Sequence, residues 1–222
     1  MERNIMLLSG LDKTKYFSDE VTREIVKCVN NPVNMVVIPA EPDNYSKNDK
    51  RFYGDFEVVG VFKMFRKIFP DLNILMLDDR VSVCDGMEWL RDADIVYLLG
   101  GNPFVQLRYL KESGYDDVIR NTSSMLIGCS AGSMNLGVNA YYSKDLEYPE
   151  SVIYKGLGVV DITIDPHFDI NNVEQVNEIK KWSRKVPIVG LPNNSFIVVS
   201  DGKVRYVGDV YLYSSLGLVK RK

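Results

Sequence analysis

Short apolar runs alternate with longer helical patterns along the first part of the chain, and this alternation most strongly limits how it can fold. Each run is almost entirely apolar, which is typical of strands that are buried on both faces. Five such strands are expected, at residues 5–8, 33–39, 72–77, 94–99 and 125–127. Helices are predicted between these strands, at residues 18–29, 56–69 and 104–112. We therefore predict an α/β fold with a doubly wound, mostly parallel sheet and helices on both faces.

The pattern changes after Tyr154. Shorter β-prone segments, with Asp201-Gly202 as a hairpin turn, are interrupted by one helical stretch at about 173–184. These segments are residues 160–166, 187–191, 195–200 and 203–213. Neither a repeat nor a linker divides the chain, so we expect one domain over residues 1–222.

Composition restricts the class of protein. A chain of 222 residues with 45% hydrophobic and 26% charged residues is typical of a globular domain. A formal net charge of −3 argues against a nucleic-acid partner. The three cysteines, Cys28, Cys84 and Cys129, have no framework spacing, and the N-terminal apolar run is too short for a signal or a membrane span. We expect a cytoplasmic protein without a membrane partner.

The fifth predicted strand runs into a turn of small residues, 128–132 (GCSAG). A strand that ends in G-x-S-x-G before a helix is the signature of a nucleophile elbow, where the residues two before and two after the nucleophile must be small. If Ser130 is the nucleophile, these two positions are Gly128 and Gly132. If Cys129 is the nucleophile, they are Ile127 and Ala131, and Ile127 fits badly. The pattern favours Ser130, with Cys129 as a small buried residue behind it. A turn that binds phosphate at a helix N-terminus is the alternative interpretation.

A serine nucleophile needs a base, and His167 is the only histidine in the chain. It follows a β-prone run and lies C-terminal to the elbow, as the base does in α/β hydrolases; a structural histidine is the alternative. A carboxylate should orient the imidazole and stabilise its cation. Spacing leaves five candidates open: Asp145, Glu147, Asp161, Asp165 and Asp169.

Two backbone N–H groups should hold the oxyanion of the intermediate. Ala131, directly after Ser130, supplies one. The loop after the fourth strand contains Gly100 and Gly101, which allow close backbone approach, and we assign the second N–H group to Gly101. Asn102 follows and is expected to contact the substrate. No cluster of residues has metal-ligand spacing, so we expect neither a metal nor an organic cofactor.

Several segments together resemble the peptidase E family of serine peptidases. They are residues 97–102 (YLLGGN), 128–132 (GCSAG), 165–168 (DPHF), 190–192 (GLP) and 200–202 (SDG). The resemblance implies a class I glutamine amidotransferase-like fold, with serine in place of cysteine at the elbow.

The same resemblance implies that Ser130 is the nucleophile and His167 the base. Peptidase E carries an aspartate fifteen residues after its serine, and Asp145 occupies that position here. Relatives often have a glutamate near the C-terminal strand as a rival third member. That position is Asn193 in this chain, and it is set aside in favour of Asp145 because it has no carboxylate.

The family includes alpha-aspartyl dipeptidases and, more distantly, cyanophycinases. Peptidase E has arginines in the helix after the histidine, where an acidic substrate can bind, but residues 172–177 contain none. We therefore predict a dipeptidase-like serine peptidase that hydrolyses small peptides, Asp-X among them, without a strict preference for N-terminal aspartate. The alternative is a catalytically inactive or amidotransferase-like relative that binds a small metabolite at the elbow. The sequence does not determine the oligomeric state.

Overall fold

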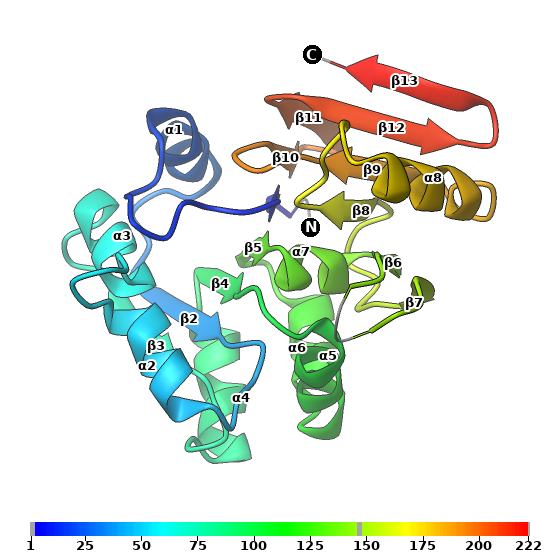
Figure 1. Ribbon diagram of the computed structural model, residues 1–222. Helices are drawn as coiled ribbons and strands as arrows, with labels where there is room; N and C mark the ends of the chain where they lie inside the picture. The colour runs from blue at the N-terminus through cyan, green and yellow to red at the C-terminus, as the bar shows by residue number, and fades with distance from the viewer. Residues whose placement is uncertain (1–2, 146–147, 222) are drawn as a thin grey trace.

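A computed structural model describes residues 3–145 and 148–221 of the chain (Figure 1). Its central sheet has seven strands in the order β11-β10-β1-β5-β4-β2-β3. Five neighbouring strands are parallel: β1 (Ile5–Leu8), β5 (Met125–Cys129), β4 (Ile95–Leu98), β2 (Asn34–Ile38) and β3 (Asn73–Met76). At one edge, β10 (Phe196–Ser200) and β11 (Lys203–Val207) run antiparallel. The prediction of a mostly parallel sheet in an α/β fold is confirmed.

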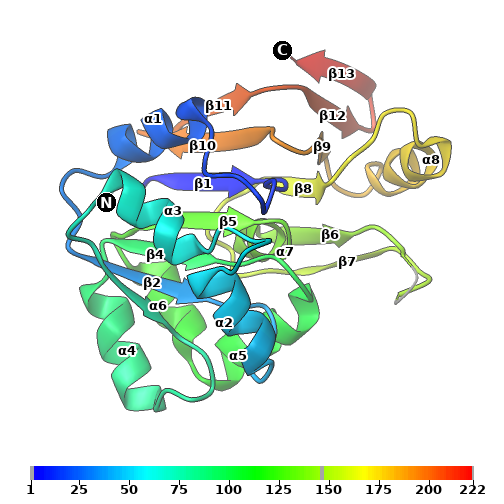
Figure 2. The ribbon, with the colours of Figure 1, turned by 60° about the vertical axis from the view of Figure 1, so that its left-hand side comes forward.

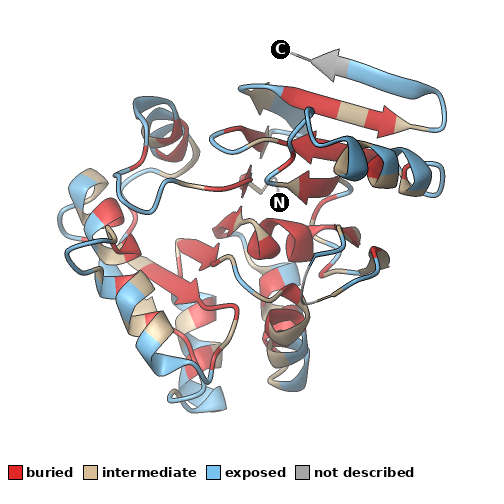
Figure 3. Ribbon diagram, in the orientation of Figure 1, coloured by how far each residue is buried: buried red, intermediate tan, exposed pale blue. Residues whose placement is uncertain are grey.

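Helices cover both faces of this sheet (Figures 1 and 2). One face packs against α1 (Asp19–Cys28), α2 (Tyr45–Tyr53) and α3 (Val61–Ile68), and the other against α4 (Val83–Asp92), α5 (Pro103–Glu112) and α6 (Tyr115–Asn121). Successive strand residues such as Leu7 and Leu8 are fully buried in opposite cores. This two-sided burial explains the continuous apolar runs and the buried strands in Figure 3.

A smaller sheet carries the C-terminal part of the chain. Its order is β13 (Gly217–Arg221), β12 (Val210–Ser214), β9 (Ile188–Leu191) and β8 (Thr163–Pro166). Helix α8 (Val173–Trp182) packs on this sheet, with Phe168, Ile179 and Tyr213 buried between them. A hairpin of β6 (Asn139–Tyr142) and β7 (Val152–Lys155) follows α7 (Ala131–Leu136).

Several boundaries differ from the sequence prediction. The helix expected from residue 56 begins at Val61, because Gly54 and Val59 form an isolated bridge before it. The strand expected over 203–213 is two strands, β11 and β12, which belong to different sheets and are separated at Gly208 with φ +79°. Helices α2, α4 and α6 were not predicted. In the described part of the chain, every helix is too short or too polar to cross a membrane.

Candidate active site

Ser130 stands between β5 and α7 in a backbone conformation that is rare for a residue with a side chain, φ 51° and ψ −112°. Its flanking glycines are sterically required. A Cβ on Gly128 would lie 2.5 Å from the Ser133 nitrogen, and one on Gly132 would collide with the Leu98 carbonyl. The strand and helix can therefore approach only because both positions lack a side chain, which is the geometry of a nucleophile elbow.

His167 follows β8 directly, and its ring joins Ser130 to Asn193. Its Nε2 lies 2.9 Å from Ser130 Oγ, and its Nδ1 lies 2.6 Å from Asn193 Oδ1. An amide oxygen can only accept a hydrogen bond, so Nδ1 carries the proton and Nε2 presents a lone pair to the serine hydroxyl. This is the tautomer that a general base requires.

Strand register brings His167 and Asn193 together. The parallel pair β8–β9 aligns Pro166 with Leu191, so the residues that follow each strand leave the sheet at the same edge. Ser9, buried at the end of β1, connects them: its Oγ accepts from the His167 N–H at 2.8 Å and donates to the Leu191 carbonyl at 2.6 Å. This contact supports His167 in its left-handed conformation, φ 57°.

The predicted third residue, Asp145, is not the residue hydrogen-bonded to Nδ1. Its carboxylate accepts from the Tyr142 hydroxyl and from the Tyr148 N–H at 2.8 Å, and it lines a cavity on the far side of His167. Asn193 holds the Nδ1 position instead. Asn193 lacks a carboxylate, but its amide oxygen accepts the same hydrogen bond.

The other candidate carboxylates lie elsewhere. Asp165 is buried under α8 and accepts from Gln175 Nε2 at 3.1 Å, and burial raises its pKa to about 7. Asp169 accepts from the Asn171 N–H at 2.9 Å, and Asp161 is exposed. Glu147 lies outside the described residues.

The glycine loop after β4 lies against the nucleophile. A Cβ on Gly100 would be 3.1 Å from Ser130 Cβ, and the Gly100 carbonyl accepts a hydrogen bond from Arg51 Nη1. Because a trans peptide points its C=O and N–H groups in opposite directions, this bond helps to fix the direction of the Gly101 N–H. Neither that N–H nor the Ala131 N–H has a hydrogen-bond partner among the described residues.

Asn102 is placed as a helix cap. Its Oδ1 accepts from the N–H groups of Phe104 and Val105 at 3.1 and 3.2 Å, which caps α5, and Pro103 is the first helical residue. Its Nδ2 donates to the Tyr148 hydroxyl at 3.0 Å. The substrate contact expected of Asn102 stays a prediction.

Cys129 lies behind Ser130 and forms a side-chain hydrogen bond with the buried Tyr97. Burial raises the pKa of its thiol to about 11, although Tyr97, Arg51 and Lys13 each lower it. The thiol is therefore protonated at neutral pH and is a poor nucleophile.

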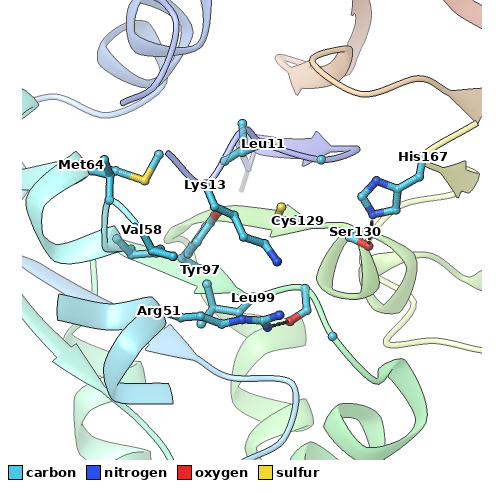
Figure 4. Close-up of a pocket in the computed structure, with 15 residues that line it drawn as sticks. Leu11, Lys13, Arg51, Val58, Met64, Tyr97, Leu99, Cys129, Ser130 and His167 are labelled. Carbon is cyan, nitrogen blue, oxygen red and sulfur yellow. Dashed lines mark hydrogen bonds between the residues drawn. The ribbon is translucent and has the colours of Figure 1, made fainter. Parts of the chain in front are cut away.

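A cavity of about 170 Å³ opens beside Ser130 and His167 (Figure 4). Its walls are mainly aliphatic: Leu11, Val58, Val59, Val61, Met64 and Leu99. Lys13, from the loop after β1, and Arg51, from α2, extend into it. Sequence reasoning missed both cations, because Lys13 and Arg51 lie about 120 and about 80 residues before the elbow and match no motif. Among the described residues, no group of three or more His, Cys, Asp or Glu side chains could hold a metal ion.

Known proteins that resemble this chain in sequence include two named peptidase E. The chain is 27% identical over 161 residues to peptidase E of Nostoc sp., and 26% identical over 134 residues to peptidase E of Escherichia coli. These alignments cover 67% and 54% of this chain, and 66% and 58% of the two relatives. The alignments thus span less than two thirds of each relative.

A solved structure shows the same fold. The crystal structure of a peptidase from an acI-B1 Actinobacterium superposes with a TM-score of 0.67 at 16% identity, covering 100% of this chain and 94% of the other. The model of peptidase family S51 matches residues 7–207. With the elbow, the paired histidine and this match in agreement, the chain belongs to peptidase family S51, a family of serine-type peptidases.

Proposed function

We propose that this chain is a serine peptidase that hydrolyses small peptides, with Ser130 as the nucleophile and His167 as the general base. The observation that carries the proposal is the hydrogen-bonded series from Ser130 Oγ through the imidazole to Asn193 Oδ1. Both ring nitrogens are engaged as a working serine–histidine pair requires. Family membership supports the same chemistry. The cytoplasmic location remains a prediction from the sequence.

The reaction follows from this geometry. Ser130 Oγ attacks the carbonyl carbon of the scissile bond while His167 Nε2 takes its proton. The Gly101 and Ala131 N–H groups hold the oxyanion of the tetrahedral intermediate. The C–N bond then breaks, and His167 returns the proton to the leaving amine. Water then attacks the acyl-serine carbonyl carbon while His167 takes its proton. The ester C–O bond breaks, His167 returns the proton to Ser130 Oγ, and the second product leaves as a carboxylic acid.

In this proposal Asn193 takes the orienting role that the family resemblance gives to Asp145. A neutral amide keeps the Nδ1–H tautomer and the ring orientation, but it adds no negative charge to stabilise the imidazolium. Papain-like proteases use an asparagine on their catalytic histidine in the same way. The assignment of Asp145 remains the competing prediction, and substitutions separate the two.

The test compares three variants by kcat on a dipeptide such as Ala-Leu. Asn193→Ala should lower kcat roughly 10²-fold or more, since it releases the general base. Asn193→Asp should keep or raise kcat, because a carboxylate accepts the same hydrogen bond and also stabilises the cation. Asp145→Asn is the matched control and should stay within about fivefold of wild type. A severe loss in Asp145→Asn with little effect in Asn193→Ala would return the role to Asp145.

A fluorophosphonate probe tests the reaction class itself. An activated serine attacks the phosphorus, so the wild-type protein should be labelled at Ser130 and Ser130→Ala should not. A wild-type protein that is neither labelled nor active on dipeptides would favour the inactive, metabolite-binding alternative.

A further inference from the structure

The cavity beside Ser130 combines two properties that a substrate must match. Its interior is aliphatic, formed by the loop after β1, the segment before α3, α3 itself and the residue after β4. Ser130 and His167 line one side of it, so a group that fills the cavity lies next to the bond that is cleaved. Burying an apolar side chain here is favourable because that side chain leaves water.

Two positive charges share this cavity, and neither forms an ion pair in the described part of the chain, although the Glu41 carboxylate lies near Arg51 Nη1 beside Gly101. Among the described residues, neither Lys13 nor Arg51 has a carboxylate within ion-pair distance. Basic residues close to them in sequence are paired: Lys15 with Asp12, Lys47 with Glu41, and Lys50 with Asp55 and Glu57.

The charges of Lys13 and Arg51 also affect other groups that line the cavity. The positive charges of Lys13 and Arg51 each lower the pKa of the Cys129 thiol, which also lines the cavity. Arg51 uses one N–H group on the Gly100 carbonyl, and a guanidinium has five. Lys13 is exposed and Arg51 is half-buried, so water screens their mutual repulsion, and an anion bound between them would form charge-assisted hydrogen bonds with both.

We infer that this cavity binds the C-terminal residue of the substrate, with its apolar side chain among the aliphatic walls and its free α-carboxylate at Lys13 and Arg51. A residue inside a longer peptide offers an apolar side chain without an anion. An acidic side chain offers the anion but leaves the aliphatic walls unfilled. Only a C-terminal apolar residue carries an apolar side chain and a free carboxylate on the same α-carbon.

This inference rests on the proposed function and narrows it. The residue in the cavity is the leaving group: its amine receives the proton from His167 when the C–N bond breaks, and its carboxylate stays with the two cations. The substrates are then dipeptides and short peptides that end in a residue such as leucine, methionine or phenylalanine.

The test measures kcat/KM for Ala-Leu, Ala-Leu amide and Ala-Asp. Wild type should prefer Ala-Leu over its amide by about tenfold or more, because the amide cannot form the charged hydrogen bonds. Ala-Leu should also exceed Ala-Asp, because aspartate does not fill the aliphatic walls. Lys13→Met should lose activity on Ala-Leu but not on the amide, which brings the two substrates within about threefold of each other. Lys15→Met, two residues away and paired with Asp12, should keep the wild-type preference.

The outcomes separate the two claims. Equal hydrolysis of Ala-Leu and its amide by wild type, in a reaction that Ser130→Ala abolishes, overturns the cavity assignment and leaves the peptidase proposal intact. An equal loss on both substrates in Lys13→Met also overturns it. If no peptide is cleaved in a Ser130-dependent way, the proposed function falls and this inference falls with it.

Discussion

The two adjacent candidate nucleophiles at the end of β5 differ in what surrounds them. Ser130 occupies the strained position of the elbow and faces the imidazole at 2.9 Å. Cys129 points toward Tyr97, where burial raises its pKa to about 11. Intrinsic nucleophilicity favours a thiolate over a hydroxyl, but a thiol that stays protonated has no such advantage.

We expect Ser130→Ala to lower kcat roughly 10⁴-fold or more on any accepted peptide. Cys129→Ala should stay within about fivefold of wild type, and iodoacetamide at pH 7 should not inactivate the wild-type protein through Cys129. Steady-state kinetics and mass spectrometry of the alkylated protein check both statements. Substantial activity in Ser130→Ala contradicts the assignment.

Gly10 lies against His167 and Asn193 and limits where both side chains can sit. A Cβ at this position would lie 2.5 Å from His167 Cε1 and 2.7 Å from His167 Nδ1. Gly10→Ala should therefore displace the ring and lower kcat about 10²-fold, as misplacement by about 1 Å can do. Its backbone φ is ordinary, so no added strain is expected from the backbone itself. A kcat near wild type, in a variant with an unchanged urea midpoint, would show that the ring tolerates the contact.

At the scale of elements, the parallel pair β8–β9 positions the base and its partner. Helix α8 covers this pair, and the buried Asp165 on β8 bonds to Gln175 on α8 at 3.1 Å. Gln175 Oε1 in turn accepts from the Asp169 N–H at 3.0 Å, just beyond His167. The side chain of Gln175 thus ties the helix to both ends of the segment that carries His167.

Asp165 makes stability depend on pH. Burial raises its pKa from 3.8 to about 7, and hydrogen bonds from Gln175 and Ser143 only partly oppose this. The native state therefore binds this proton more tightly than the unfolded state, so the free energy of unfolding falls as pH rises from about 4 to about 7 and levels above that.

Asp165→Asn removes this titration and should gain stability over wild type across that window, by about 1 kcal/mol or more at pH 8. Urea unfolding of both proteins between pH 4.5 and pH 8 measures the difference. If the free energies of unfolding of the two proteins change with pH in the same way, the assignment of this titration to Asp165 is wrong.

At the scale of the whole molecule, charge is distributed unequally around the nucleophile. The cavity with Lys13 and Arg51 lies on one side, and the cavity beyond His167 contains Asp145, Glu174 and Glu178. Lys144 lines the second cavity but is paired with Glu174 at 2.6 Å. Other arginines serve elsewhere: Arg205 pairs with Glu24, and Arg108 lies in a separate cavity with Phe104.

This distribution bears on N-terminal specificity. Near the first turn of α8 an acidic side chain would meet carboxylates rather than arginines, and an unpaired buried carboxylate is costly. We expect kcat/KM for Asp-Leu to exceed that for Ala-Leu by no more than about tenfold, or about 1.4 kcal/mol. Both peptides end in leucine, so the comparison leaves the proposed carboxylate contact unchanged. A hundredfold preference for Asp-Leu would show that a cation does reach the N-terminal side chain.

Features that depend on near neighbours in the chain could be predicted from the sequence. The central strands, the helix over about 104–112, the elbow and its preference for Ser130 all follow from local sterics and periodicity. The polar α2, with Phe52 its one buried hydrophobic residue, gave too little apolar pattern to be recognised. The second sheet was missed because strand pairing between distant segments leaves no local pattern.

The sequence alone determined which residues were available: one histidine, a serine between two glycines, and apolar strands for a buried sheet. Only the tertiary structure decided which groups meet. Register between β8 and β9 set Asn193, rather than the carboxylate of Asp145, against the imidazole, and the loop after β1 and α2 brought Lys13 and Arg51 into one cavity. Hydrogen bonds and charges act over distances in space, and sequence separation does not report those distances.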